Sequence, residues 1–203
     1  MTSTRDLRIR FGAELYDRFG GIVRYGPFKG MRLPATSSWS RSDMCPKLLG
    51  TYEAEVVETL APLLADGKTL ADIGAADGYF AVGFLHAGLC ERAIAFELNP
   101  EGRSRIGEMT SANGVADRLT IFGAADSTFP DVLRGTGLDI RDCVVLIDVE
   151  GAEFSILEPR HSPPSRRRRR WSSCTAALRA WRMASPSRTP CCEDCTRSSM
   201  CES

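Results

Sequence analysis

Short apolar runs alternate with helix-like stretches between residues 69 and 149, and this alternation limits the folds open to the 203-residue chain more than any other feature. Strand-like runs bounded by turn residues are expected at 69–73, 92–98, 119–122 and 143–149. Helical stretches are expected at 79–89, 99–113 and around 132–133. Parallel strands joined by crossover helices have this order. The sequence therefore predicts an α/β fold with a doubly wound, mostly parallel sheet.

The residues before this region predict an N-terminal extension with a helix and a hairpin. Four apolar residues near the start recur at steps of four, which predicts one face of a helix that ends at Gly20-Gly21. These residues are Leu7, Phe11, Leu15 and Phe19. Residues 22–25 and 29–33 flank Gly26-Pro27-Phe28 and predict a short hairpin. A further helix is expected to begin at a cap formed by Thr51.

The first expected strand of the alternating region leads directly into the sequence DIGAADGYF, residues 72–80. Gly74 and Gly78 permit a tight turn and a close approach of the backbone to a ligand. The helix that follows directs free N–H groups and the positive end of its dipole toward the same place. Asp72 adds a carboxylate that can attract an ammonium group. In open α/β sheets ligands bind at this end of the strands, so we expect a binding site here.

Two common phosphate-binding motifs do not fit this turn. A dinucleotide-binding loop needs three glycines, but the matching positions here are Gly74, Ala76 and Tyr79. A P-loop needs Gly-Lys followed by Ser or Thr, which this turn lacks. The pattern that fits is acid-x-Gly-x-small-x-Gly, with Ala76 as the small residue. A plain strand-to-helix turn without a ligand remains the alternative interpretation.

Taken with AFELNP (95–100) and LIDVEGAEFSIL (146–157), the turn resembles the class I S-adenosylmethionine-dependent methyltransferases, which have a Rossmann-like fold, and more narrowly the FkbM-type family. The resemblance covers about residues 47–158. It implies S-adenosyl-L-methionine as cofactor and methyl transfer to a hydroxyl of a small-molecule or glycan acceptor. It also implies that Asp72, Gly74 and Gly78, with Ala76 between the glycines, hold the methionine end of the cofactor.

The same resemblance gives roles to acids that follow later strands. Glu97 is expected to accept hydrogen bonds from the ribose hydroxyls, and Asp126 to lie near the adenine or to cap a helix. Asp148 and Glu150 are expected where cofactor and acceptor meet, as catalytic or acceptor-orienting groups. Asp148 ends the most apolar run, which is expected to be the most buried strand. Glu153 is more typical of a first-turn helix acid, and no metal site is expected.

The composition changes sharply after Pro159. Through residue 159 there are 16 Lys and Arg against 23 Asp and Glu, whereas residues 160–203 hold 10 Arg, 3 acids and five of the eight Cys. Such a tail cannot fill a core, so it is expected to be disordered. We therefore expect an extension at 1–46, a methyltransferase core at 47–159 and a separate tail at 160–203. Because the family's sheet has further strands after this point, the fold is expected to be incomplete on its C-terminal side.

Three interpretations of the tail remain open. An out-of-frame reading of a GC-rich gene gives such a composition, whereas the run 166–170 suggests a basic arm for nucleic acid, and Cys192 with Cys195 suggests a zinc knuckle. A cofactor-binding remnant without turnover, or a basic-tailed nucleic-acid-binding protein, is the alternative to an enzyme, although nucleic acid is not the expected partner. No stretch approaches the length of a membrane span, and a cytoplasmic location is expected. The sequence does not specify an oligomeric state.

Overall fold

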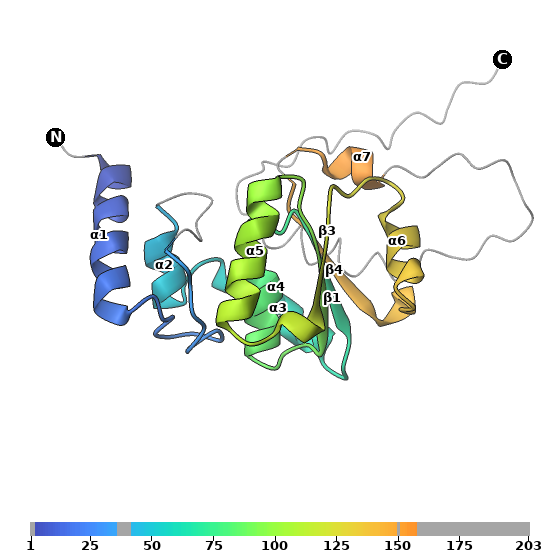
Figure 1. Cartoon of the computed structure of the whole chain (residues 1–203), viewed down its shortest axis with the longest axis horizontal. Helices are drawn as coiled ribbons and strands as arrows, with labels where there is room; N and C mark the ends of the chain where they lie inside the picture. The colour runs from blue at the N-terminus through green and yellow to red at the C-terminus, as the bar shows by residue number, and fades with distance from the viewer. Residues whose placement is uncertain (1–2, 36–41, 150, 158–203) are drawn as a thin grey trace, which may run out of the picture.

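A four-stranded, all-parallel sheet in the order β3-β2-β1-β4 forms the centre of the chain. We describe it from a computed structural model, in which residues 3–35, 42–149 and 151–157 are described (Figure 1). The strands are β1 (Thr69–Ile73), β2 (Arg92–Phe96), β3 (Leu119–Phe122) and β4 (Cys143–Ile147). The parallel pairing confirms the expected α/β fold. Glu150 and the tail at 160–203 lie outside the described residues.

Helices cover both faces of this sheet. They are α1 (Thr4–Phe19), α2 (Met44–Leu49), α3 (Ala54–Leu64), α4 (Tyr79–His86), α5 (Pro100–Ala112), α6 (Phe129–Gly135) and α7 (Glu153–Leu157). Figure 1 shows α3, α4 and α5 on one side of the sheet and α6 on the other. The doubly wound arrangement is therefore present, and α1 stands at the far end from α6 and contacts α2. No helix among the described residues is both long and apolar enough to cross a membrane.

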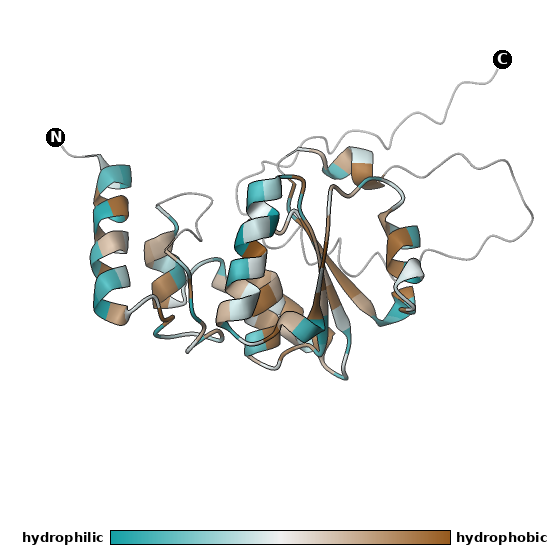
Figure 2. Ribbon diagram, viewed as in Figure 1, coloured by the Kyte–Doolittle hydropathy of each residue, from teal (hydrophilic) through white to brown (hydrophobic). Residues whose placement is uncertain are grey.

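The two faces of the sheet bury alternate residues of the same strands. In β2, Ala93 and Ala95 pack with α4 and α5, whereas Ile94 and Phe96 pack on the side of α6. This follows from the two-residue period of a strand. Figure 2 shows the resulting concentration of hydrophobic residues in the strands and the helices beside them. Every residue of β1 is buried, which makes it the centre of the core.

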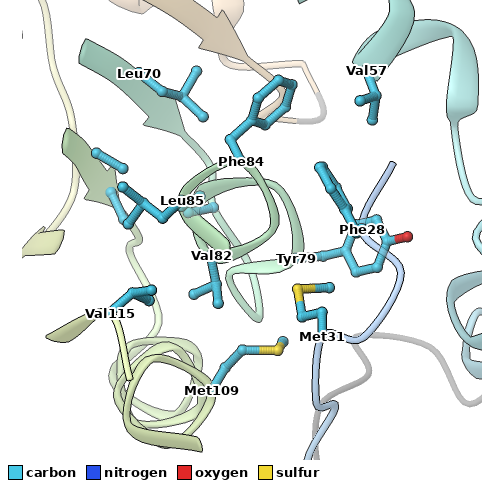
Figure 3. Close-up of a cluster of buried hydrophobic side chains, with 14 of the residues drawn as sticks. Phe28, Met31, Val57, Leu70, Tyr79, Val82, Phe84, Leu85, Met109 and Val115 are labelled. Atoms are coloured by element: carbon cyan, nitrogen blue, oxygen red, sulfur yellow. The ribbon is translucent and has the colours of Figure 1, made fainter. Parts of the chain in front are cut away.

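The N-terminal segment packs against α4 through an aromatic ring. The ring of Phe28 lies 5.3 Å from that of Tyr79 and 5.4 Å from that of Phe84, both in edge-to-face contact (Figure 3). The ring also rests on Gly83, where an added Cβ would overlap its atoms. Glycine at this helix position is therefore required by packing, although glycine lowers helix propensity.

Several sequence-based expectations for the N-terminal part need correction. The hairpin is reduced to a single antiparallel bridge between Ile22 and Arg32. Helix α3 begins after Glu53 and not after a cap formed by Thr51, and the short helix α2 was not expected. Helix α1 ends at Gly20 as expected. Leu15 and Phe19 of its apolar face are partly buried against the core, whereas Leu7 and Phe11 are 39% and 54% exposed, so only the C-terminal half of this face is covered.

Strand β4 is not the most buried strand, contrary to expectation. Only Val144 is fully buried, and the other four residues of the strand are half-buried. The physical reason is its position, because among the described residues β4 pairs with β1 alone and forms an edge of the sheet. An apolar sequence favours burial, but neighbouring elements have to provide it.

Candidate functional site

The residues that follow β1, β2 and β4 meet at the edge of the sheet formed by the carboxyl ends of the strands. The parallel register places Ile73 beside Phe96 on one side and beside Ile147 on the other. Beyond these pairs, the N–H of Gly74 donates to the carbonyl of Phe96 (2.9 Å), and the N–H of Asp148 donates to that of Ile73 (2.9 Å). The backbone after each strand is therefore held against its neighbour before any side chain is considered.

The turn between β1 and α4 has a backbone that few residues adopt. Gly74 and Gly78 have φ angles of +89° and +85°, and Ala76 has φ +52°. A Cβ at Gly74 would overlap the carbonyl oxygen of Asp148. The first glycine is therefore required both by its φ angle and by the close approach of β4. Ala76 is a non-glycine residue in the left-handed region, a conformation that costs about 1 kcal/mol or more.

Asp72, the fourth residue of β1, presents a buried carboxylate at this turn. Burial raises the pKa of Asp72 to about 7, a hydrogen bond from the backbone of Ala81 opposes the rise, and the negative charges of Asp148, Asp77 and Glu97 add to it. Its Oδ2 atom is buried and has no hydrogen-bond partner among the described residues. A buried acceptor without a partner is unfavourable, so this oxygen is a candidate contact for a cationic donor.

Glu97, directly after β2, joins two loops through its carboxylate. Its Oε2 accepts from the N–H of Ala76 (2.8 Å) and its Oε1 from the N–H of Asn99 (2.7 Å). Arg103 of α5 donates to the carbonyl of Glu97 (2.9 Å), and a Cβ at Gly102 would lie 2.7 Å from Cγ of Glu97. The side chain is 6% exposed, so its position is fixed by the turn and by α5 together.

The remaining predicted site residues, Asp148, Asp126 and Glu150, are not buried at the turn as Asp72 and Glu97 are, or lie outside the described residues. Asp148 is exposed, and its charge raises the pKa values of both Asp72 and Glu53. Asp126 is exposed, and its Oδ1 accepts from the N–H of Thr128 (2.6 Å) in the turn before α6. The N-cap of α6 is Thr128, so Asp126 is not the helix cap that the sequence suggested as one alternative. Asp72, Glu97 and Asp148 therefore share one edge. Glu150 lies outside the described residues.

Two residues at this edge were missed by sequence reasoning. Nζ of Lys47 lies 2.5 Å from Oδ2 of Asp77, and both side chains are buried. The same Nζ lies 5.0 Å from the ring centre of Tyr52 and 5.2 Å from that of Tyr79. Asp77 lies within the motif of residues 72–78, but the acid-x-Gly-x-small-x-Gly pattern assigns no role to its position and does not indicate an ion pair with Lys47. The available signal was a single Lys among the apolar residues of 44–49.

Glu53 is a third missed residue. It has φ +43° and begins α3 without a side-chain cap. Burial and the charge of Asp148 raise the pKa of Glu53, against the opposing effect of a hydrogen bond with Tyr52. Its position beside Asp148 makes it a further carboxylate of the site. No group of three or more potential metal ligands gathers among residues 3–35, 42–149 and 151–157.

Comparisons with known proteins give short or distant similarities. No family model matches the chain. The chain is 40% identical over 60 residues to a ribosomal protein L11 methyltransferase of Actinobacillus pleuropneumoniae, which covers 30% of this chain and 20% of that relative. The chain thus matches about a fifth of the length of this curated relative.

Solved structures give the second comparison. A precorrin-6y C5,15-methyltransferase of Geobacter metallireducens has a TM-score of 0.40 at 21% identity and covers 62% of this chain and 58% of its own. A putative O-methyltransferase of Klebsiella pneumoniae has a TM-score of 0.37 at 16% identity, covering 70% of this chain and 53% of its own. The α/β fold itself rests on the strand order and pairing described above.

Proposed function

We propose that the chain is a class I S-adenosylmethionine-dependent methyltransferase. The observation that carries the proposal is the buried Oδ2 of Asp72, without a partner among the described residues, beside a turn that Glu97 closes from the next strand. The motif resemblance to FkbM-type methyltransferases supports it, as does the 60-residue similarity to a protein methyltransferase. The plain-turn interpretation leaves the buried acceptor without an explanation.

The residues of the turn fit the two polar ends of S-adenosylmethionine. The ionised carboxylate of Asp72 would hold the ammonium group at its free oxygen. Each oxygen of Glu97 accepts one backbone N–H and keeps a second lone pair, so the pair of oxygens would accept the two ribose hydroxyls. Hydrogen bonds to a charged group contribute about 1.5–3 kcal/mol each. We assign Gly74, Ala76 and Gly78 to the backbone of the same site, and Asp126 to its adenine side.

The proposed reaction places the acceptor near Asp148. When bound, S-adenosylmethionine supplies a methyl group on a positively charged sulfur, and alignment of the attacking atom provides most of the rate enhancement. Asp148 and Glu150 would orient an acceptor hydroxyl and take up its proton. Following the FkbM-type resemblance, we propose a small-molecule or glycan hydroxyl as acceptor. Glu53 competes for the role of base, because its pKa is raised and it lies near Asp148.

Isothermal titration calorimetry of the whole chain with S-adenosylmethionine tests the cofactor site. Glu97→Gln should weaken binding about tenfold or more, because it removes the charge that the hydroxyls contact. Glu101→Gln is the matched control, since Glu101 lies on the same segment but its side chain is 79% exposed. Its affinity should stay within about twofold of wild type. A folded wild-type chain that does not bind S-adenosylmethionine would overturn the proposal.

Methyl transfer from labelled S-adenosylmethionine tests the acceptor side. Glycan and small hydroxyl acceptors are expected to be labelled, and ribosomal protein L11 serves as the competing substrate. Asp148→Asn should lower turnover about a hundredfold, the usual contribution of a general base, with little change in cofactor affinity. The same loss in Glu53→Gln, with full activity in Asp148→Asn, would transfer the role to Glu53. Labelling of ribosomal protein L11 alone would overturn the hydroxyl acceptor.

A further inference from the structure

The ion pair between Lys47 and Asp77 joins helix α2 to the glycine turn and has no role in the function proposed above. The side chains of Lys47 and Asp77 are 4% and 2% exposed, and the two atoms of the pair lie 2.5 Å apart. Two tyrosine rings cover the ammonium group, at 5.0 Å for Tyr52 and 5.2 Å for Tyr79. A buried Lys with one carboxylate and two aromatic faces around it is a fixed element and not a solvated side chain.

Asp77 uses its two oxygens for two different purposes. Its Oδ1 accepts from the N–H of Tyr79 (3.2 Å), in the first turn of α4, and its Oδ2 contacts Lys47. The residue before it, Ala76, is in the left-handed region. Such a conformation persists only where several surrounding contacts impose it. Among the described contacts, Glu97 holds the N–H of Ala76 from one side and Lys47 holds Asp77 from the other.

We propose that Lys47 is a positioning residue of the ligand site, which acts through Asp77 to hold the glycine turn in the shape that binds the cofactor. The inference rests on the proposed function and adds that α2, upstream of the sheet, is part of the cofactor site. Lys47 does not contact the ligand in this proposal. It opposes the tendency of the strained turn at Ala76 to relax.

Stabilisation of the fold is not sufficient to explain the pair. The desolvation of two buried charges offsets much of their attraction, and replacing both partners by uncharged residues of similar size is often neutral or stabilising. Removing one partner, in contrast, leaves an uncompensated buried charge. The charge of Asp77 also lies near enough to raise the pKa of Asp72. Lys47 therefore contacts a carboxylate whose charge acts on Asp72, the residue assigned to the ligand.

A double variant of the full chain, Lys47→Met with Asp77→Asn, tests the proposal. Met keeps an unbranched stem over the two tyrosine rings, and the Asn oxygen still accepts from the N–H of Tyr79. The matched control is Arg134→Met with Asp131→Asn, because this pair on α6 has a similar separation of 2.6 Å but side chains that are 53% and 71% exposed. Lys47→Arg is a third variant that keeps the positive charge.

Three measurements read the result: thermal unfolding, amide hydrogen exchange of residues 74–78, and calorimetry with S-adenosylmethionine. In the double variant we expect a melting temperature near that of wild type, exchange of the turn about tenfold faster, and a Kd raised about tenfold at unchanged stoichiometry. The control pair should leave all three unchanged. Lys47→Arg should retain most of the wild-type protection and affinity.

Wild-type exchange and affinity in the double variant would overturn the proposal. So would a variant that unfolds, or one with reduced stoichiometry at unchanged Kd, because both results assign the pair to the fold alone. An equal loss in Lys47→Arg would assign the effect to packing and would overturn it too. If the wild-type chain binds no S-adenosylmethionine but the turn still exchanges faster in the double variant, the proposed function fails while the holding role of Lys47 is supported.

Discussion

At the carboxyl ends of the strands, the region after β1 and β2 and the region after β4 differ in how many contacts hold their residues. On the side of β1 and β2, every residue of β1 is buried. Glu97, which follows β2, is 6% exposed, and its carboxylate accepts hydrogen bonds from two backbone N–H groups. On the side of β4, the strand is mostly half-buried and Asp148 is exposed. Phe154, in the short helix that follows, is 81% exposed. One side is held by buried side chains and backbone hydrogen bonds, and the other is not enclosed among the described residues.

This difference shows which half of the proposed reaction is encoded locally. The cofactor side depends on residues that lie close in sequence to a strand end, and their backbone contacts fix them before a ligand arrives. In the proposal the acceptor side depends on Asp148, which is exposed, and on Glu150, which lies outside the described residues.

The largest effect is expected at Gly74. Gly74→Ala would place a Cβ onto the carbonyl oxygen of Asp148 and impose φ +89° on an alanine, so we expect a loss of about 4 kcal/mol or more, which for a marginally stable domain means loss of the fold. Gly107→Ala is the opposite control, because no atom lies within 4 Å of its Cβ position in helix α5. It should stabilise by about 0.5–1 kcal/mol. Urea denaturation measures both, and equal stabilities would contradict the description of the turn.

The second effect concerns the charge of Asp72. Burial raises its pKa from 3.8 to about 7, so the folded chain keeps a proton that the unfolded chain has lost, and stability falls as the pH rises from about 4 to 7. Each pKa unit corresponds to about 1.4 kcal/mol. Asp72→Asn should remove this fall, so its stability relative to wild type should increase on the order of 4 kcal/mol across that interval. Urea denaturation at several pH values measures the difference.

The same ionisation of Asp72 should control the affinity for S-adenosylmethionine. Because the proposed contact needs a charged carboxylate, the affinity of the wild-type chain for S-adenosylmethionine should rise with pH up to about 7 and then level off. Asp72→Asn should bind weakly at every pH. A more stable variant that keeps wild-type affinity would show that Asp72 serves the fold and not the site.

The smallest effects compare two phenylalanines. Phe129 is 6% exposed and packs beneath β2 on the α6 side, so Phe129→Ala should cost about 3 kcal/mol. Phe154→Ala should change stability by less than about 0.5 kcal/mol, because its ring is 81% exposed. Thermal unfolding of both variants measures the contrast. A large loss in Phe154→Ala would mean that the β4 side is as enclosed as the other.

The parts of the fold that depend on local pattern could be predicted from the sequence. The bounds of β1 and β3 follow from short apolar runs between turn residues, and Asn99 caps α5 through its side chain as its position before Pro100 suggests. The burial of β4 could not be predicted, because apolar composition does not say which neighbours a strand has. The N-cap of α3 is Glu53, in the left-handed region and without a side-chain cap, and not Thr51 as the residue type suggested.

The candidate site divides in the same way. Asp72 and Glu97 lie at strand ends, and the topology of a parallel sheet brings such ends together, so their proximity follows from the sequence. The pair of Lys47 and Asp77 joins residues 30 positions apart through a helix that the pattern did not indicate. Its existence depends on how α2 packs, and the single Lys among the apolar residues of 44–49 does not name its partner.

The ring of Phe28 resting on Gly83 has a consequence for how the chain can be divided. A chain shortened to begin at β1 would lack Phe28, which covers Gly83 of α4, and would also lack Lys47, the counter-charge of Asp77. A fusion that contains only the sheet region would therefore lack the ring that covers Gly83 and the partner of Asp77. The first fifty residues should be kept together with the sheet when this chain is recombined with another.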